Sequence, residues 1–327
     1  MKPKYYIITL FALAISMLFF VKCTKEDLSD CGIVVRFKYD KHIQDIKFSD
    51  EVHRIDLYIF DENGNYMEMV SSQPSDVLAN GFLPETFEFV LRDIKPGTYT
   101  LVAWCNVSNA FFTSSLLVPG ASSYNTATLT YNDDDVNRRG PDLSLFYGSQ
   151  RSVTVESNAG TQVVTIDLMK YSNHVSITAS GFPEGFDSNS FNCTIISSDG
   201  SYLFNGNFSS NNPSITYRPT KDPKQNGTVI EFDFYILRET NDNLTNSKLR
   251  ITYTRPDGSE LVLREESLVN VLKSLARTAS NPLNTGDLDI DHEFFISIDI
   301  IFNETSNTVS VTIKDWDPVQ QVPRPLY

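Results

Sequence analysis

Cys23 is the residue whose type and position most clearly predict chemistry. It stands at the exit of an uncharged apolar segment, residues 5–21, which follows the basic side chains Lys2 and Lys4. A short basic start and an apolar segment of this length are typical of a secretory signal. We expect residues 1–22 to be removed, and acyl chains to be attached to the Cys23 thiol and the new amino group. Several acyl chains, at about 0.8 kcal/mol for each buried methylene, would hold the mature protein stably at a membrane.

Two alternatives to lipidation stay open at this stage. Phe20-Val21-Lys22 stands where lipoproteins usually have small residues before the lipid-bearing Cys. The apolar segment would then be a retained amino-terminal membrane anchor, or an ordinary export signal cut nearby. Lys25-Glu26-Asp27 resembles the tether of lipoproteins that reach the outer leaflet, and this favours lipidation. We therefore predict a lipid-anchored tether over residues 23–32.

The remaining candidate side chains form no constellation that supports an enzyme. The histidines are dispersed and lack a metal-ligand spacing. They are His42, His53, His174 and His292. The run Asp133-Asp134-Asp135 lacks the spaced ligands of a calcium loop, so we expect it to be solvated. Nucleophile, dinucleotide and phosphate-binding motifs are missing from the sequence. We predict no catalytic, cofactor-binding or metal-binding residues and no cofactor.

Charge excludes one class of partner. The chain has 27 basic and 41 acidic side chains. Removing residues 1–22 takes away three lysines and no acids, which leaves 24 basic side chains and a net charge of −17. Nucleic acid is not expected as a partner, because phosphate binding needs a basic surface.

The cysteines indicate no disulfide framework. Beyond Cys23 there are Cys31, Cys105 and Cys193, an odd number for an oxidising compartment. Cys105 and Cys193 adjoin strand-like segments and are expected to be small buried hydrophobes. A bridge between Cys31 and Cys105 stays open.

Period-two alternation predicts an all-β protein. Ile55, Leu57 and Ile59 alternate with more polar residues before an Asn63-Gly64 hairpin signal. Similar segments recur, and residues 153–155 and 163–168 are predicted as a further pair of strands. We predict an N-terminal β-sandwich of about seven strands over residues 33–170 and a C-terminal β-sandwich over residues 171–327.

One segment departs from the strand pattern. Leu268, Val271, Leu272 and Leu275 have helical spacing and predict one short amphipathic helix in the second domain. Trp104 and Trp316 end strands in the two halves and are predicted to be packing residues, although an exposed Trp would offer a stacking surface for a sugar.

Several motifs in a fixed order resemble one family, the FimB/Mfa-type fimbrial anchor subunits of the fimbrillin superfamily. They are the lipoprotein start at residues 23–31, Leu57-Tyr58-Ile59-Phe60-Asp61-Glu62-Asn63-Gly64, residues 94–104, Leu145-Phe146-Tyr147-Gly148, and residues 309–316. The resemblance spans essentially the whole chain. It implies two tandem transthyretin-like β-sandwich domains, an outer-membrane lipid anchor and a place at the base of a fimbrium.

The resemblance also implies a fimbrial shaft subunit as partner, bound by β-strand pairing. Our candidate for the pairing strand is the tail after Trp316. It comprises Val319, Gln320, Gln321 and Val322. Pro318, Pro323 and Pro325 lack an N–H and limit the ladder to a short stretch. A disordered terminus is the plain alternative for this tail.

Two other functions remain open from the sequence. Tandem sandwiches on a lipid tether also serve as surface glycan-binding lipoproteins, which would need exposed aromatic platforms. A hydrolase would need a cleft with converging carboxylates, and nothing in the sequence indicates one.

Overall fold

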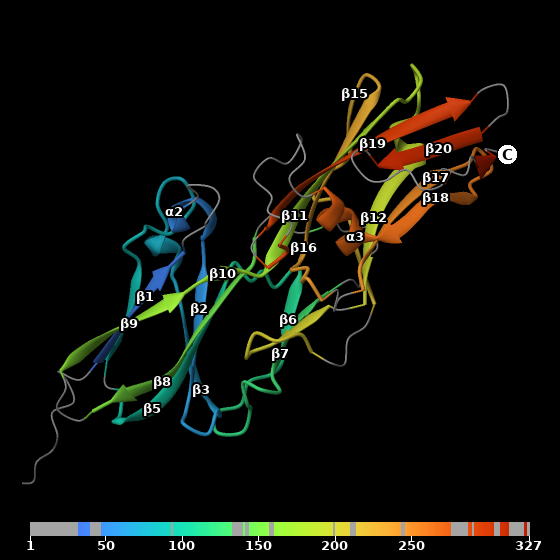
Figure 1. Cartoon of the computed structure of the whole chain (residues 1–327). Helices are drawn as coiled ribbons and strands as arrows, with labels where there is room; N and C mark the ends of the chain where they lie inside the picture. Colours follow the sequence, from blue (N-terminus) through green and yellow to red (C-terminus); the bar gives the residue numbers. More distant parts are fainter. Residues whose placement is uncertain are drawn as a thin grey trace, which may run out of the picture.

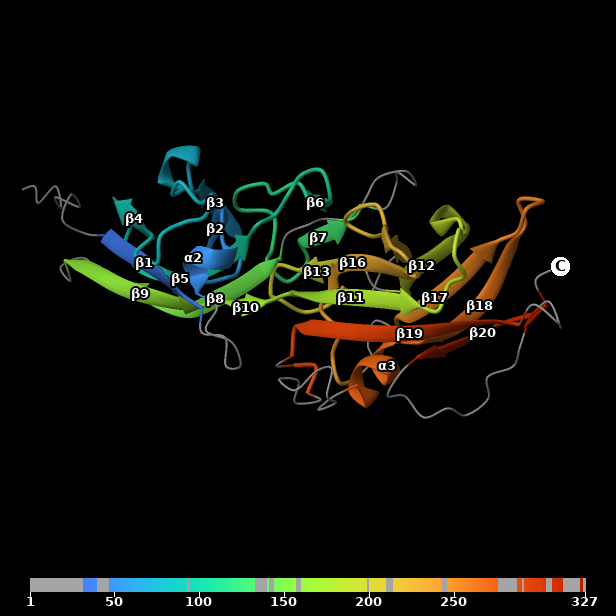
Figure 2. The ribbon, with the colours of Figure 1, turned by 90° about the horizontal axis from the view of Figure 1, so that it is seen from above.

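The computed structural model consists of two β-sheet halves that lie end to end (Figure 1). It describes residues 32–39, 47–92, 94–132, 140, 144–156, 160–198, 200–209, 214–242, 246–275, 287–289, 291–303, 308–313 and 324–325. Strands β10 and β11 continue along one line from the first half into the second (Figure 2). The molecule is therefore elongated along the direction in which the chain crosses between its halves.

The first half is a sandwich of a three-stranded sheet, in the order β4-β1-β9, and a five-stranded sheet, in the order β10-β8-β5-β2-β3. Its strands are β1 (Gly32–Lys38), β2 (Ile55–Phe60), β3 (Tyr66–Ser71), β4 (Glu88–Arg92), β5 (Gly97–Cys105), β8 (Phe146–Val155), β9 (Thr161–Asp167) and β10 (Met169–Lys170). Both sheets contribute to one core, in which Ile33, Leu57 and Leu101 are fully buried. Alternation along the strands places these side chains on the inner faces.

The second half repeats this plan with a six-stranded sheet, β15-β16-β11-β19-β20-β21, and a four-stranded sheet, β14-β12-β17-β18. Its strands are β11 (Ser172–Ser180), β12 (Phe191–Ser197), β14 (Ile215–Tyr217), β15 (Lys224–Asn226), β16 (Val229–Leu237), β17 (Lys248–Thr254), β18 (Glu260–Ser267), β19 (Glu293–Asn303), β20 (Thr308–Ile313) and β21 (Arg324–Pro325). The prediction of an all-β fold with two tandem β-sandwiches is confirmed.

A third group of strands joins the two halves. β6 (Phe112–Ser114) and β7 (Thr128–Tyr131) belong to the first half of the chain, and β13 (Ser201–Leu203) belongs to the second. They form one sheet in the order β13-β7-β6. The sheet gives the halves a shared backbone ladder. The boundary between residues 170 and 171 stays a prediction; β10 ends at Lys170 and β11 begins at Ser172.

The predicted helix in the second half is present as α3 (Leu268–Ser274). The Ser267 hydroxyl caps its amino end by accepting a bond from the Asn270 N–H. Leu268, Val271 and Leu272 are fully buried, so the helical spacing in the sequence marks the face that packs on the core. A second helix, α2 (Phe48–Glu51), was not predicted, because a single turn is too short for a periodic signal.

Strand pairing differs from the simplest expectation for residues 153–155 and 163–168. β8 pairs antiparallel with β5, whereas β9 leaves for the other sheet and pairs in parallel with β1. β11 and β19 form a second parallel pair. Parallel partners are distant in sequence, so hydrophobic alternation identifies the strands without identifying their neighbours.

The predicted packing role of Trp104 is confirmed, because its side chain is fully buried. Trp316 lies outside the described residues. Trp104→Ala is expected to lower the free energy of unfolding by about 3–5 kcal/mol, as for other buried Trp truncations. Chemical denaturation measures the change. Leu116→Ala is the matched control: Leu116 is 86% exposed, so its truncation is expected to leave stability nearly unchanged. Equal effects of the two substitutions would contradict the packing role.

Candidate functional site: strand edges and the junction of the halves

The site residues predicted from the sequence lie outside the part of the chain that the structure describes. These are the lipidation residue Cys23 and the tail residues Val319, Gln320, Gln321 and Val322. Both sites therefore stay predictions. Two described features adjoin the predicted tail: the strand that follows it and the sheet edge on which that strand lies.

The chain after the predicted tail returns to the second half as β21. Pro325 pairs with Thr308 and Arg324 with Val309, in antiparallel register with β20. Proline is tolerated on an edge strand when the missing N–H would face away from the ladder. Pro325, expected from the sequence to limit pairing, is thus part of a strand that no sequence pattern predicted.

A side chain also covers part of the β20 edge. Arg264 Nη1, from β18, donates a hydrogen bond of 3.0 Å to the Val311 carbonyl. Arg264 also forms an ion pair of 3.1 Å with Glu266. Covered edges resist unintended pairing with other chains. The β20 edge is therefore occupied by β21 at Thr308 and Val309 and by the Arg264 side chain at Val311.

β3 is a more open edge, at the side of the five-stranded sheet away from β10. Its two ends are bonded to neighbouring loops. The Tyr66 N–H donates to the Ser122 carbonyl at 2.7 Å, the Gly120 N–H donates to the Tyr66 carbonyl at 2.8 Å, and Gln73 Nε2 donates to the Ser71 carbonyl at 3.0 Å. Between these ends, Met67 and Met69 are 38% and 43% exposed. Exposed apolar side chains on an edge strand suit pairing with an incoming strand.

An aromatic cluster holds the two halves together around Trp104. The Trp104 ring lies 4.8 Å from that of Tyr147, 5.6 Å from Tyr171 and 5.7 Å from Tyr202. Tyr202 comes from β13 in the second half, and its hydroxyl donates to the Tyr171 carbonyl at 3.1 Å. The same hydroxyl accepts a bond of 3.0 Å from the Arg238 N–H. The cluster therefore combines apolar packing with hydrogen bonds that fix the backbone at Tyr171, the linker residue between β10 and β11.

A buried charge cluster lies where the chain crosses between the halves. Lys170, 1% exposed at its side chain, contacts Glu51 of α2 at 3.0 Å and Glu293 of β19 at 2.9 Å. Glu293 also bonds His174 Nδ1 at 2.7 Å. His174 in turn stacks on the Tyr235 ring at 4.7 Å. One lysine thus joins an acid of the first half to an acid of the second.

Each charge in this cluster offsets the cost of burying its neighbours in their ionised forms. Burial opposes the charge on Glu293, yet the hydrogen bond from His174 and the charge of Lys170 lower the pKa of Glu293 to about 2. Burial also opposes the ammonium of Lys170, and the charges of Glu293 and Glu51 outweigh it, so its pKa is raised. No sequence pattern indicates this cluster, because Glu51 and Glu293 lie 119 and 123 positions from Lys170 in the chain.

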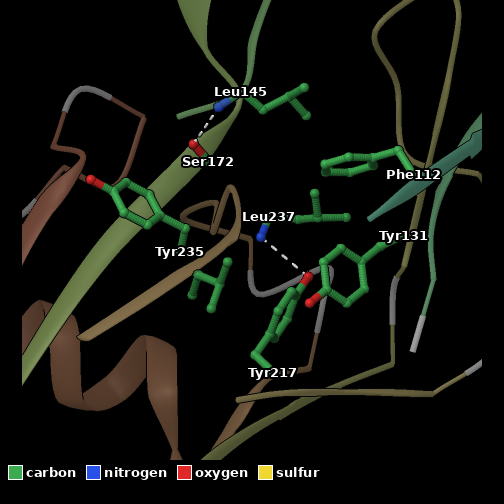
Figure 3. Close-up of a pocket in the computed structure, with 8 residues that line it drawn as sticks. Phe112, Tyr131, Leu145, Ser172, Tyr217, Tyr235 and Leu237 are labelled. Carbon is green, nitrogen blue, oxygen red and sulfur yellow. Dashed lines mark hydrogen bonds between the residues drawn. The ribbon is translucent and has the colours of Figure 1, made fainter. Parts of the chain in front are cut away.

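A small pocket lies between strands of both halves (Figure 3). It adjoins the charge cluster through Tyr235, whose ring stacks on His174. Its lining comprises Phe112, Tyr131, Leu145, Ser172, Tyr217, Tyr235, Ile236 and Leu237. The Ser172 hydroxyl accepts a bond from the Leu145 N–H at 2.9 Å, and the Tyr217 hydroxyl accepts one from the Leu237 N–H at 3.1 Å. The space holds about one water molecule, so it is a packing gap and not a ligand site.

The described cysteines match their predicted role. Cys105 and Cys193 are free, buried thiols, and burial raises the pKa of each. Cys31, the other half of the bridge left open above, lies outside the described residues. Within the described ranges, no group of three or more His, Cys, Asp or Glu side chains could hold a metal ion.

The fold places the chain among proteins built from two tandem β-sandwiches. Its sequence matches the family of fimbrillin-A associated anchor proteins Mfa1 and Mfa2 over residues 28–322. The chain therefore belongs to this family.

Individual relatives agree with this assignment. The major fimbrium anchoring subunit FimB of Porphyromonas gingivalis is 26% identical over 199 residues, which are 57% of this chain and 59% of that protein. The match thus spans less than two thirds of the relative.

Solved structures show the same fold. The fimbrial anchor protein Mfa2 of Porphyromonas gingivalis superposes with a TM-score of 0.65 at 20% identity, over 87% of this chain and 97% of that one. A Bacteroides thetaiotaomicron protein proposed to bind polysaccharide has the same TM-score and identity, over 89% and 98% of the two chains. At these identities the likeness concerns the fold.

The charge cluster predicts a pH dependence. Because the pKa of Glu293 in the folded chain is about 2, against an ordinary 4.5, its contribution to stability is complete above pH 4.5 and is lost as the pH falls toward 2. Glu293→Gln is expected to lower the free energy of unfolding at pH 7 by about 3 kcal/mol and to flatten its decline in acid.

Denaturation curves collected across this pH range measure both effects. Glu62→Gln is the matched control, because Glu62 is exposed in the turn between β2 and β3 and is expected to change neither quantity. An unchanged acid decline in Glu293→Gln would contradict the assigned role of the cluster.

Proposed function

We propose that this protein is an outer-membrane lipoprotein that holds the base of a fimbrium at the cell surface. In this proposal Cys23 carries the lipid, and the proximal shaft subunit binds by β-strand pairing. The observation that carries the anchoring role is the family match over residues 28–322. Strand pairing is proposed from two sheet edges: the β20 edge, where β21 already pairs, and β3, which exposes Met67 and Met69.

The amino-terminal sequence supports attachment through lipid. Cys23 follows the apolar segment, and the described fold begins soon afterwards, at Gly32 of β1. Within the described ranges, none of the helices has the length and apolar character needed to cross a membrane. A lipid on Cys23 would thus join the membrane to β1 through a short tether.

The carboxyl-terminal segment supports strand pairing. Arg324 and Pro325 already pair with β20, so this part of the chain is compatible with an extended edge position. Residues 319–322 are separated from them in the sequence by Pro323 alone and would offer their backbone to a neighbouring subunit. Backbone hydrogen bonds would give affinity, and alternate side chains would give specificity.

Glycan binding has less support than anchoring. Among the large hydrophobic side chains that are exposed in the described part of the chain, Phe295 of β19 is the single aromatic one. Trp104, one of the two tryptophans considered for sugar stacking, is fully buried. Sugar capture normally needs an accessible aromatic face, and Phe295 alone does not make a platform.

Cys23→Ala tests the lipid anchor. Without the acceptor thiol no acyl chain is attached, so the protein is expected to leave the membrane fraction for the periplasm or medium and to lose metabolic fatty-acid label. Cys31→Ala is the matched control and is expected to keep both the label and the membrane location. Label that persists in Cys23→Ala would refute lipidation at this residue.

Two deletions test the pairing tail. Removing residues 318–327 is expected to shed fimbriae into the medium while the anchor protein stays on the cell. Removing only residues 323–327 takes away β21 but keeps Val319 to Val322, so retention is expected. Fimbriae are counted on cells and in the medium. Normal retention with the longer deletion would move the contact to another edge, and β3 would be the first to test.

A further inference from the structure

The parallel pairing of β1 with β9 determines where the chain enters and leaves the first half. Seven residue pairs join these strands, from Gly32 with Thr161 to Lys38 with Asp167. The Leu168 N–H extends the contact by donating to the Lys38 carbonyl at 2.7 Å. Because the strands are parallel, the amino end of β1 and the carboxyl end of β9 lie at opposite ends of the ladder.

The covalent chain leaves this ladder at the same two opposite ends. Toward the amino terminus, β1 leads back to Cys23. Toward the carboxyl terminus, β9 continues through Leu168 and β10 into β11 of the second half. A pull between Cys23 and the second half therefore acts along the strands in opposite directions. All the ladder bonds bear this load together, in shear. An antiparallel pair would have both exits at one end and would open bond by bond.

Packing adds to the resistance against sliding. Ile33 and Val35 of β1 are fully buried in the first core, and Phe37 is 8% exposed. Phe37 contacts the ring of Phe89, on β4, at 5.9 Å. β4 also pairs with the other side of β1 over five residue pairs. Sliding β1 along β9 would therefore break two ladders and drag three large side chains through a close-packed core.

The exit of β9 is held as well. β10 pairs with β8, where Met169 faces Tyr147 and Lys170 faces Phe146. Lys170 is the residue that bonds both Glu51 and Glu293. Force that arrives from the second half thus meets a bonded segment before it reaches the β1–β9 ladder.

We infer that the first half is a load-bearing clamp, in which the parallel β1–β9 ladder carries in shear the tension between the membrane and the fimbrium. The inference rests on the proposed function for the source of the tension. The resistance itself is a property of the folded chain and is measurable without membrane or fimbria.

Single-molecule pulling in two directions tests the clamp. The mature chain, with Cys23 and Cys31 replaced by Ser, carries an amino-terminal handle. The second handle is attached through Glu184→Cys, in the exposed turn after β11, or through Thr161→Cys, an exposed residue directly opposite Gly32. The first geometry shears the ladder and the second peels it from one end. The buried Cys105 and Cys193 are protected from labelling.

The shear geometry is expected to need a rupture force at least about twofold higher than the peel geometry at equal pulling speed, because seven residue pairs are loaded together. In the shear geometry, the extension released on rupture should match the unfolding of residues 32–168 at about 3.6 Å per residue. A force ratio below about two, or a released length from the second half, would overturn the clamp. Neither result depends on lipidation, so loss of anchoring in Cys23→Ala and loss of the clamp are separable.

Discussion

The arrangement of this protein depends on the burial of aromatic side chains from both halves around Trp104. Tyr147 belongs to the first half, Tyr202 to the second, and Tyr171 lies in the linker between them. Burying these rings removes a large apolar area from water, and their tilted contacts add further stabilisation. Because the cluster straddles the crossing point, separating the halves would expose it. The two sandwiches are thus held in one orientation without a long rigid linker.

Polar contacts at the junction specify the same orientation. Lys170 has two acids within 3.0 Å, one from each half, and the shared β7–β13 pairing adds backbone bonds. A buried lysine with a missing partner would be strongly destabilising, so this arrangement selects against other relative positions of the halves. If the chain holds a fimbrium as proposed, a fixed junction would transmit force from one half to the other with little bending.

The strand edges divide into closed and open ones. The β20 edge is covered by β21 and by the Arg264 side chain, whereas β3 exposes two methionines along most of its length. Closed edges protect against unintended pairing, and an open edge leaves a position for a partner strand. If residues 319–322 pair with a partner subunit as proposed, the contact would lie close in the sequence to β21.

The sequence by itself indicated many of the longer strands, the helix at Leu268 and the family, because period-two and helical spacings are local and motif order survives at low identity. It also marked Trp104 and the two inner cysteines as core residues. Only the tertiary structure decided that β1 lies parallel to β9, that Lys170 meets Glu51 and Glu293, and that β13 joins the first half. These contacts link residues separated by more than seventy positions. Alternation states which face of a strand is buried, but the neighbour is chosen by the packing of the whole chain.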